Sequence, residues 1–175
     1  MDLQLNFQLD FLKVLLFLIP LYIANSSAML FGGKTPIDLG RKWKDGLPIF
    51  GNGKTFRGAI AGIFFGTLSG FLISIFYDYT SAVYSNYILL GFLLSIGAII
   101  GDLVASFFKR RNAIKRGSPV LLLDQLDFVF GGLVFGSIVY VPNFYEIFVI
   151  CVVTLVMHKL SNYVAYRLKI KKVPW

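Results

Sequence analysis

Five long apolar stretches constrain this chain most strongly, because each is long enough to cross the ~30 Å hydrocarbon core of a bilayer as a helix. They are continuously apolar, whereas a β-barrel strand would alternate over ~10 residues. Of the 175 residues, 57% are hydrophobic and only 15% are charged, which argues against a disordered chain or a soluble domain. The sequence predicts an all-α integral membrane protein, a single domain with five transmembrane helices over residues 11–31, 59–76, 87–108, 120–141 and 145–166.

The charged residues predict how these helices are oriented. The connections at 32–58 and 109–119 and the C-terminal tail are rich in Lys and Arg, whereas the other connections contain Asp78 but no Lys or Arg. The positive-inside rule places basic loops in the cytoplasm. We therefore expect a multi-pass protein of the cell membrane with its N-terminus outside and its C-terminus cytoplasmic. These basic cytoplasmic segments account for the net charge of +8, so no nucleic-acid partner is expected.

Glycine recurs every four residues in the second stretch, at Gly58, Gly62, Gly66 and Gly70. Small residues at this spacing form a groove that lets another helix approach closely. We expect this groove to serve packing within one helix bundle. A homodimer through the same face is the alternative.

Three aspartates lie inside the third and fourth stretches: Asp102, Asp124 and Asp127. Acids in a membrane segment are costly and are therefore candidates for function. The short connection between the two stretches makes them antiparallel neighbours, so the three carboxylates are expected to converge near the cytoplasmic ends. Their charge must be offset either by ion pairs with nearby basic side chains or by a cation. Oxygen ligands without Cys or His favour Mg²⁺.

Residues 51–58 form a glycine-rich, basic segment directly before the second stretch, in which Lys54 and Arg57 suit a phosphate. The segment is not a Walker A loop, since Pro48 stands where that motif needs a glycine. Alternatively, it is a turn whose basic residues contact anionic lipid. Carboxylates for a metal and cations for phosphates, at a lipid–water boundary, fit phosphoryl or nucleotidyl transfer from a soluble compound to a lipid.

Three motifs resemble those of the CTP:phosphatidate cytidylyltransferases, or CDP-diacylglycerol synthases. Residues 101–115 resemble the family signature G-D-L-x-x-S-x-x-K-R followed by a lysine. Residues 124–127 resemble its D-x-x-D, and residues 54–58 resemble its K-T-W/F-x-G. The short chain, the PIDLGR stretch at 36–41 and the departures Arg116 and Gln125 look like the archaeal branch of the family, the CDP-archaeol synthases.

The resemblance implies Mg²⁺-dependent transfer of CMP from CTP to an unsaturated archaeal ether-lipid phosphate, a prenylated glycerol phosphate, on the cytoplasmic side. It implies catalytic roles for Asp102, Lys109, Asp124 and Asp127, with the three aspartates as metal ligands. It implies that substrate is bound by Lys54, Thr55, Arg57, Ser106, Arg110, Lys115 and Arg116.

Two other functions stay open from the sequence. One is a CDP-diacylglycerol synthase that acts on phosphatidate. The other is a small ion-coupled membrane transporter with the aspartates as an ion or proton relay. The clustering of the acids toward one side of the membrane and the lack of a half-helix repeat count against a transporter.

Overall fold

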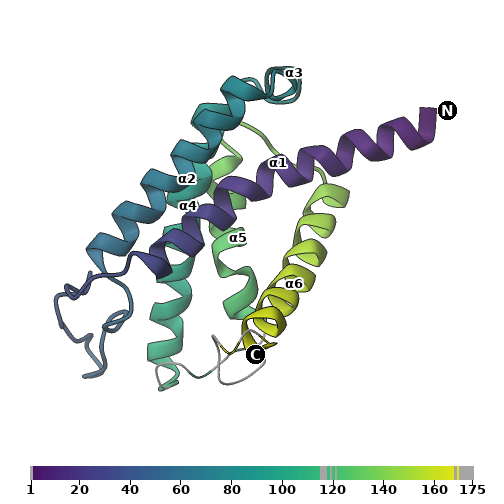
Figure 1. The fold of residues 1–175 in the computed structure, drawn as a ribbon. Helices are drawn as coiled ribbons and strands as arrows, with labels where there is room; N and C mark the ends of the chain where they lie inside the picture. The colour runs from purple at the N-terminus through teal and green to yellow at the C-terminus, as the bar shows by residue number, and fades with distance from the viewer. Residues whose placement is uncertain (1, 115–117, 119, 121, 168, 170–175) are drawn as a thin grey trace.

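The computed structural model describes residues 2–114, 118, 120, 122–167 and 169, and within them the chain is all-α. Four helical segments of these residues are long and apolar enough to cross a membrane: Phe11–Leu30, Phe56–Phe76, Tyr87–Arg111 and Phe144–Ser161. The six helices of these residues, shown in Figure 1, are α1 (Asp2–Leu30), α2 (Phe56–Phe76), α3 (Tyr79–Val83), α4 (Tyr87–Arg111), α5 (Leu123–Gly136) and α6 (Phe144–Arg167).

The expected helix over residues 120–141 is wrong in its extent. Helix α5 has 14 residues, so it is about 20 Å long and shorter than the hydrocarbon core. Its end is set locally, because Val139 and Tyr140 both donate their N–H groups to the carbonyl of Gly136 and form a turn. Pro142 then follows, and proline cannot continue a helix. The apolar run therefore continues beyond the helix. The short helix α3, between α2 and α4, was not expected.

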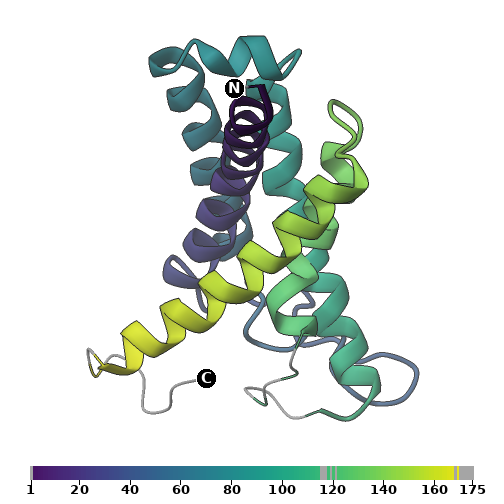
Figure 2. The ribbon, with the colours of Figure 1, turned by 90° about the vertical axis from the view of Figure 1, so that its right-hand side faces the viewer.

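Apart from the short α3, successive helices run in opposite directions. Figure 2 shows the loop after α1, the C-terminal end of α4, the N-terminal end of α5 and the C-terminal end of α6 at one end of the molecule. The start of α1 and helix α3 lie at the opposite end. The loop after α1 and the helix ends that flank the other two basic segments thus lie together at one end.

The glycines of α2 pack inside the bundle, as expected. A Cβ added at Gly62 would lie 2.8 Å from the carbonyl oxygen of Ala24 in α1, and one at Gly70 would lie 3.2 Å from the Cα of Gly91 in α4. Backbone this close leaves no room for a side chain. The groove is filled by α1 and α4, so a homodimer would need a different face of the molecule.

A polar cluster fixes the start of α6 at the end opposite the basic loops. The carboxylate of Glu146 is 2% exposed and accepts hydrogen bonds from the Tyr140 hydroxyl and the Asn143 backbone N–H. The N–H of Glu146 donates to Oδ1 of Asn143 in return. This reciprocal pair is a capping box, and it defines where α6 begins.

Candidate active site

The loop between α1 and α2, residues 31–55, folds around one buried carboxylate. Asp38 accepts hydrogen bonds from the backbone N–H groups of Gly40 at 3.0 Å, Phe50 at 3.0 Å and Gly51 at 2.8 Å. Burial raises the pKa of Asp38, but these hydrogen bonds outweigh it, and the pKa lies below its ordinary value. Asp38 therefore holds the glycine-rich segment in place as a charged group.

Arg111, in the last turn of α4, attaches this loop to the helix bundle. Its Nε lies 2.8 Å from Oδ2 of Asp45, and its Nη2 donates to the carbonyl of Pro48 at 2.6 Å. The guanidinium also lies 4.7 Å from the ring centroid of Phe107, at cation–π distance. No sequence motif identifies Asp38, Asp45 or Arg111. Arg111 and Asp45 come together only in the folded chain, and Asp38 binds backbone N–H groups of its own loop.

Thr55 ends the loop and begins α2. Its hydroxyl oxygen accepts hydrogen bonds from the N–H of Gly58 at 3.2 Å and the N–H of Gly33 at 3.0 Å. The first bond is an N-cap, and the second ties the end of α1 to the start of α2. Thr55 is buried and thereby fixes the backbone next to Lys54.

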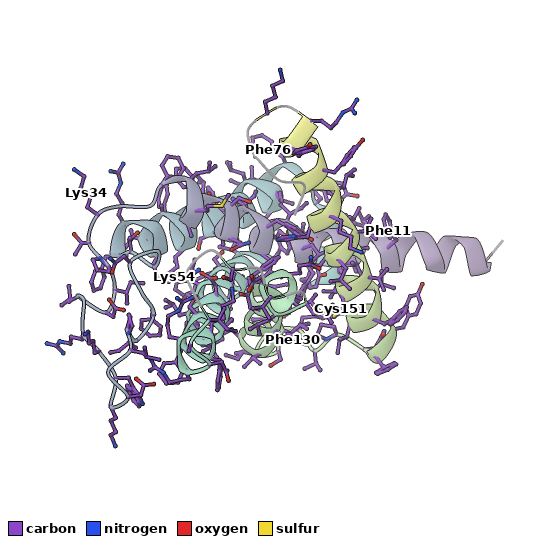
Figure 3. All side chains as sticks on the ribbon, turned by 90° about the horizontal axis from the view of Figure 1, so that it is seen from below. Phe11, Lys34, Lys54, Phe76, Phe130 and Cys151 are labelled. Carbon is purple, nitrogen blue, oxygen red and sulfur yellow. The ribbon has the colours of Figure 1, made fainter. Side chains whose placement is uncertain are left out.

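Lys54 points from the loop toward the helices, as Figure 3 shows, and binds Asp102 of α4. Its Nζ lies 2.5 Å from both carboxylate oxygens. Both side chains are partly exposed, at 28% and 23%. The pair is therefore reachable from solvent.

Lys54 lines two hollows. The larger, of about 440 Å³, lies between α1, α2, α4 and the loop, and its lining includes Asn25, Ala28, Met29, Gly33, Lys54, Ile99, Asp102 and Leu103. The smaller, of about 200 Å³, is lined by Phe50, Gly51, Gly53, Lys54, Ser106, Lys109 and Arg110. The larger hollow thus combines charged and apolar walls, whereas three of the seven residues around the smaller one are basic.

The other two aspartates lie on α5, beside α4. Asp124 forms an ion pair with Lys109, and Asp127 lies within electrostatic reach of Asp102, Asp124 and Lys54. Gly101 permits this proximity, because a Cβ there would lie 3.1 Å from the Cα of Gly131. Across the described part of the chain, no three acidic, His or Cys side chains are close enough to form a ready cation site. Asp102 is paired with Lys54 and Asp124 with Lys109, and the convergence of the three acids on one metal ion stays a prediction.

The remaining expected site residues fall into three groups. Ser106, Lys109 and Arg110 line the smaller hollow. Arg57 lies elsewhere, on the outer face of α2, where it lines neither of these two hollows. Lys115 and Arg116 lie outside the described residues.

The fold is an apolar helix bundle, and a solvent-accessible Lys54–Asp102 pair lies at its basic end. These two features define the class of the protein as an integral membrane enzyme that acts on lipid phosphates. The model of the CarS-like family, CDP-archaeol synthase, matches residues 7–175. The chain belongs to this family.

Relatives from several archaea support the assignment. The CDP-archaeol synthase of Methanocaldococcus jannaschii is 47% identical over 91% of this chain and 94% of its own. The CDP-archaeol synthase of Sulfolobus acidocaldarius is 43% identical over 92% of this chain and 96% of its own. A solved structure described as an intramembrane enzyme for archaeal membrane lipid biosynthesis superimposes with a TM-score of 0.79 at 32% identity, covering 86% of this chain and 93% of that one.

Proposed function

We propose that this chain transfers CMP from CTP to a prenylated glycerol phosphate lipid, forming CDP-archaeol and pyrophosphate for membrane phospholipid synthesis. Membership of the CDP-archaeol synthase family supports the reaction. The observation that carries the assignment of the site is the Lys54–Asp102 pair between two hollows of different character. A nucleotidyl transfer needs two phosphate-bearing substrates brought to one point.

The smaller hollow suits the triphosphate of CTP. Lys54, Lys109 and Arg110 supply positive charge there, and Ser106 supplies a hydroxyl donor. Lys54 and Lys109 are each paired with an aspartate without substrate. On CTP binding, they would exchange carboxylate partners for phosphate oxygens, which frees Asp102 and Asp124.

The larger hollow suits the lipid phosphate. Lys54 and Asn25 offer donors to its head, whereas Ala28, Met29 and Leu103 offer an apolar wall for the first part of its chains. An oxygen of the ionised lipid phosphate attacks the α-phosphorus of CTP, and the bond from that phosphorus to the β-phosphate oxygen breaks. No strong base is required, because the attacking phosphate is already ionised. Lys54 and Lys109 then neutralise the departing pyrophosphate.

The carboxylates of Asp102, Asp124 and Asp127 would hold Mg²⁺. Hard oxygen donors without His or Cys fit this ion, the three acids come from two adjacent helices, and Asp127 lies within electrostatic reach of both Asp102 and Asp124. When bound, Mg²⁺ neutralises triphosphate charge and polarises a phosphoryl oxygen. Before substrate binds, Lys54 neutralises Asp102 and Lys109 neutralises Asp124.

We also propose five passes through the membrane, with the short α5 as the fourth, and a cytoplasmic active site. The basic residues at the loop end support this orientation. CTP is a soluble cytoplasmic nucleotide and would reach both hollows from that side. Labelling by a membrane-impermeant reagent of a cysteine introduced at Lys42 or at Asp78, in a protein with the native Cys151 replaced by Ala, tests it. We expect protection of position 42 and labelling of position 78 in intact cells.

An assay of purified protein with labelled CTP and a panel of lipid phosphates tests the reaction. The panel should vary glycerol stereochemistry, ether or ester linkage, and chain saturation. We expect CDP-lipid from the unsaturated archaeal ether lipid at a rate well above that from phosphatidate. Preference for phosphatidate would instead support a CDP-diacylglycerol synthase, and no product from any lipid would refute cytidylyl transfer.

A further inference from the structure

A third hollow lies on the outer face of α2, at the end where the basic loop joins it. It has a volume of about 580 Å³ and contains neither Asp102 nor Lys54. Basic and polar residues form one part of it, and apolar residues of α2 form the rest. Its lining consists of Gly33, Lys34, Thr35, Phe56, Arg57, Ile60, Ala61 and Phe64. We call it the outer groove.

The apolar part of the outer groove follows the axis of α2. Phe56, Ile60 and Phe64 are spaced four residues apart and therefore share one face of the helix. Their exposed fractions are 45%, 67% and 58%, respectively. Because α2 is a candidate membrane span, this exposed face is the one that hydrocarbon chains contact.

The charged part of the outer groove has two exposed cations, Lys34 and Arg57. Neither forms an ion pair with any carboxylate among the residues that the structure describes. Figure 3 shows Lys34 at the outer edge of the molecule, directed away from the helices. Two cations at the head of an apolar track complement a lipid that carries a phosphate, and Arg can bind that phosphate through two hydrogen bonds.

Gly33 connects the outer groove with the active site, because it lines both the groove and the larger hollow beside Asp102. A Cβ at this position would lie 3.0 Å from Cβ of Arg57. The two hollows therefore approach each other at a residue without a side chain. Arg57 of the groove is also close in sequence to Lys54 of the larger hollow, with only Thr55 and Phe56 between them.

We propose that the outer groove is a docking site that binds the phosphate-bearing lipid substrate from the membrane before its headgroup enters the larger hollow. The proposal rests on the function proposed above, since it names how the lipid of that reaction arrives. Lys34 and Arg57 bind the phosphate, and the chains lie along Phe56, Ile60 and Phe64. Arg57 thus serves lipid capture, and Lys54 serves the reacting groups.

Steady-state kinetics of the Lys34→Ala/Arg57→Ala double variant in vesicles of neutral lipid tests the proposal. We expect the KM for lipid phosphate, expressed as its fraction in the bilayer, to rise about tenfold. The KM for CTP and the kcat should change less than twofold. The matched control is Lys42→Ala/Lys44→Ala, which removes the same charge from exposed positions outside the groove and should behave as wild type. Equal KM values for lipid in the two double variants would overturn the proposal.

A binding measurement separates this proposal from the reaction itself. A photoreactive ether-lipid phosphate is incorporated into vesicles with Asp102→Asn protein, and the cross-linked peptide is identified. We expect cross-links along α2 between Phe56 and Phe64 that Lys34→Ala/Arg57→Ala reduces several-fold. Equal labelling by the same lipid without its phosphate would mean ordinary bilayer contact and would refute the docking site. If wild type made no CDP-lipid while labelling remained phosphate-dependent, only the proposed reaction would fail.

Discussion

Nζ of Lys54 lies 2.5 Å from both carboxylate oxygens of Asp102, and this ion pair joins the loop before α2 to the interior of the bundle. The two residues are 48 positions apart in the sequence. Neither the loop nor α4 alone forms a site. Lys54 lines both the larger and the smaller hollow, and Asp102 lines the larger one, so loss of the pair should affect both substrates.

A double-mutant cycle of Lys54→Ala and Asp102→Asn tests this coupling. Each single change should lower kcat by about 10²–10³-fold, as loss of a charge-stabilising group in an active site does. The double variant should be much less impaired than the product of the single effects, because the two residues act as a unit. Additive effects would show that they act independently. Lys42→Ala is the matched control, an exposed lysine of the same loop that should retain full activity.

Asp38→Asn should loosen the loop. The carboxylate accepts three backbone hydrogen bonds, and its loss should cost about 1–3 kcal/mol of local stability. Limited proteolysis between residues 39 and 51 measures this, and the variant should be cut faster at neutral pH. Exposed Asp78→Asn is the control for removing an acid and should not change the cleavage rate.

The pH dependence of the loop follows from the lowered pKa of Asp38. A depressed pKa means that the stabilisation is complete above the ordinary value of about 4 and is lost as the pH falls through the lower folded-state value. Wild-type protease resistance should therefore decrease at acidic pH. In Asp38→Asn, protease resistance should no longer show this decrease at acidic pH. The same pH dependence of protease resistance in both proteins would contradict the role assigned to Asp38.

The close approach of α2 to α1 makes Gly62 sensitive to any side chain. Gly62→Leu should lower stability by about 1–3 kcal/mol, since even a Cβ would lie 2.8 Å from the carbonyl oxygen of Ala24. Thermal unfolding in detergent measures the change. Ile75→Leu, at an exposed position of the same helix, should leave the midpoint unchanged. A stable Gly62→Leu variant would show that the two helices can separate.

The sequence predicted the long helices well, because each depends on a pattern within one segment. Continuous apolar runs identified α1, α2, α4 and α6, and the DLVASFFKR and DQLD motifs identified the acids. The end of α5 at Gly136 was missed, since an apolar run does not show where a helix stops. Asp38 and Arg111 were missed because their partners are backbone groups of a folded loop. The position of Arg57 outside the larger and smaller hollows was not predicted, because it depends on which face of α2 packs against α1 and α4.

Nucleotide selectivity provides a test that needs no turnover. CTP with Mg²⁺ should raise the Tm of the purified protein in proportion to its binding, and ATP or GTP at equal concentration should raise it less. Lys109→Ala should reduce the shift, because Lys109 lines the smaller hollow and pairs with Asp124. Equal shifts with all three nucleotides would argue against a cytidine-selective site.

Transfer of label from α-labelled CTP to lipid by wild type and Asp124→Asn, across a Mg²⁺ titration, measures whether the aspartates of α4 and α5 hold a catalytic metal ion. We expect labelled CDP-lipid from wild type only when Mg²⁺ is present. In Asp124→Asn we expect a loss of at least about a hundredfold, while that variant keeps the wild-type elution profile and Tm. Equal rates in the two proteins, or a wild-type rate that chelation of Mg²⁺ leaves unchanged, would contradict this role of the aspartates.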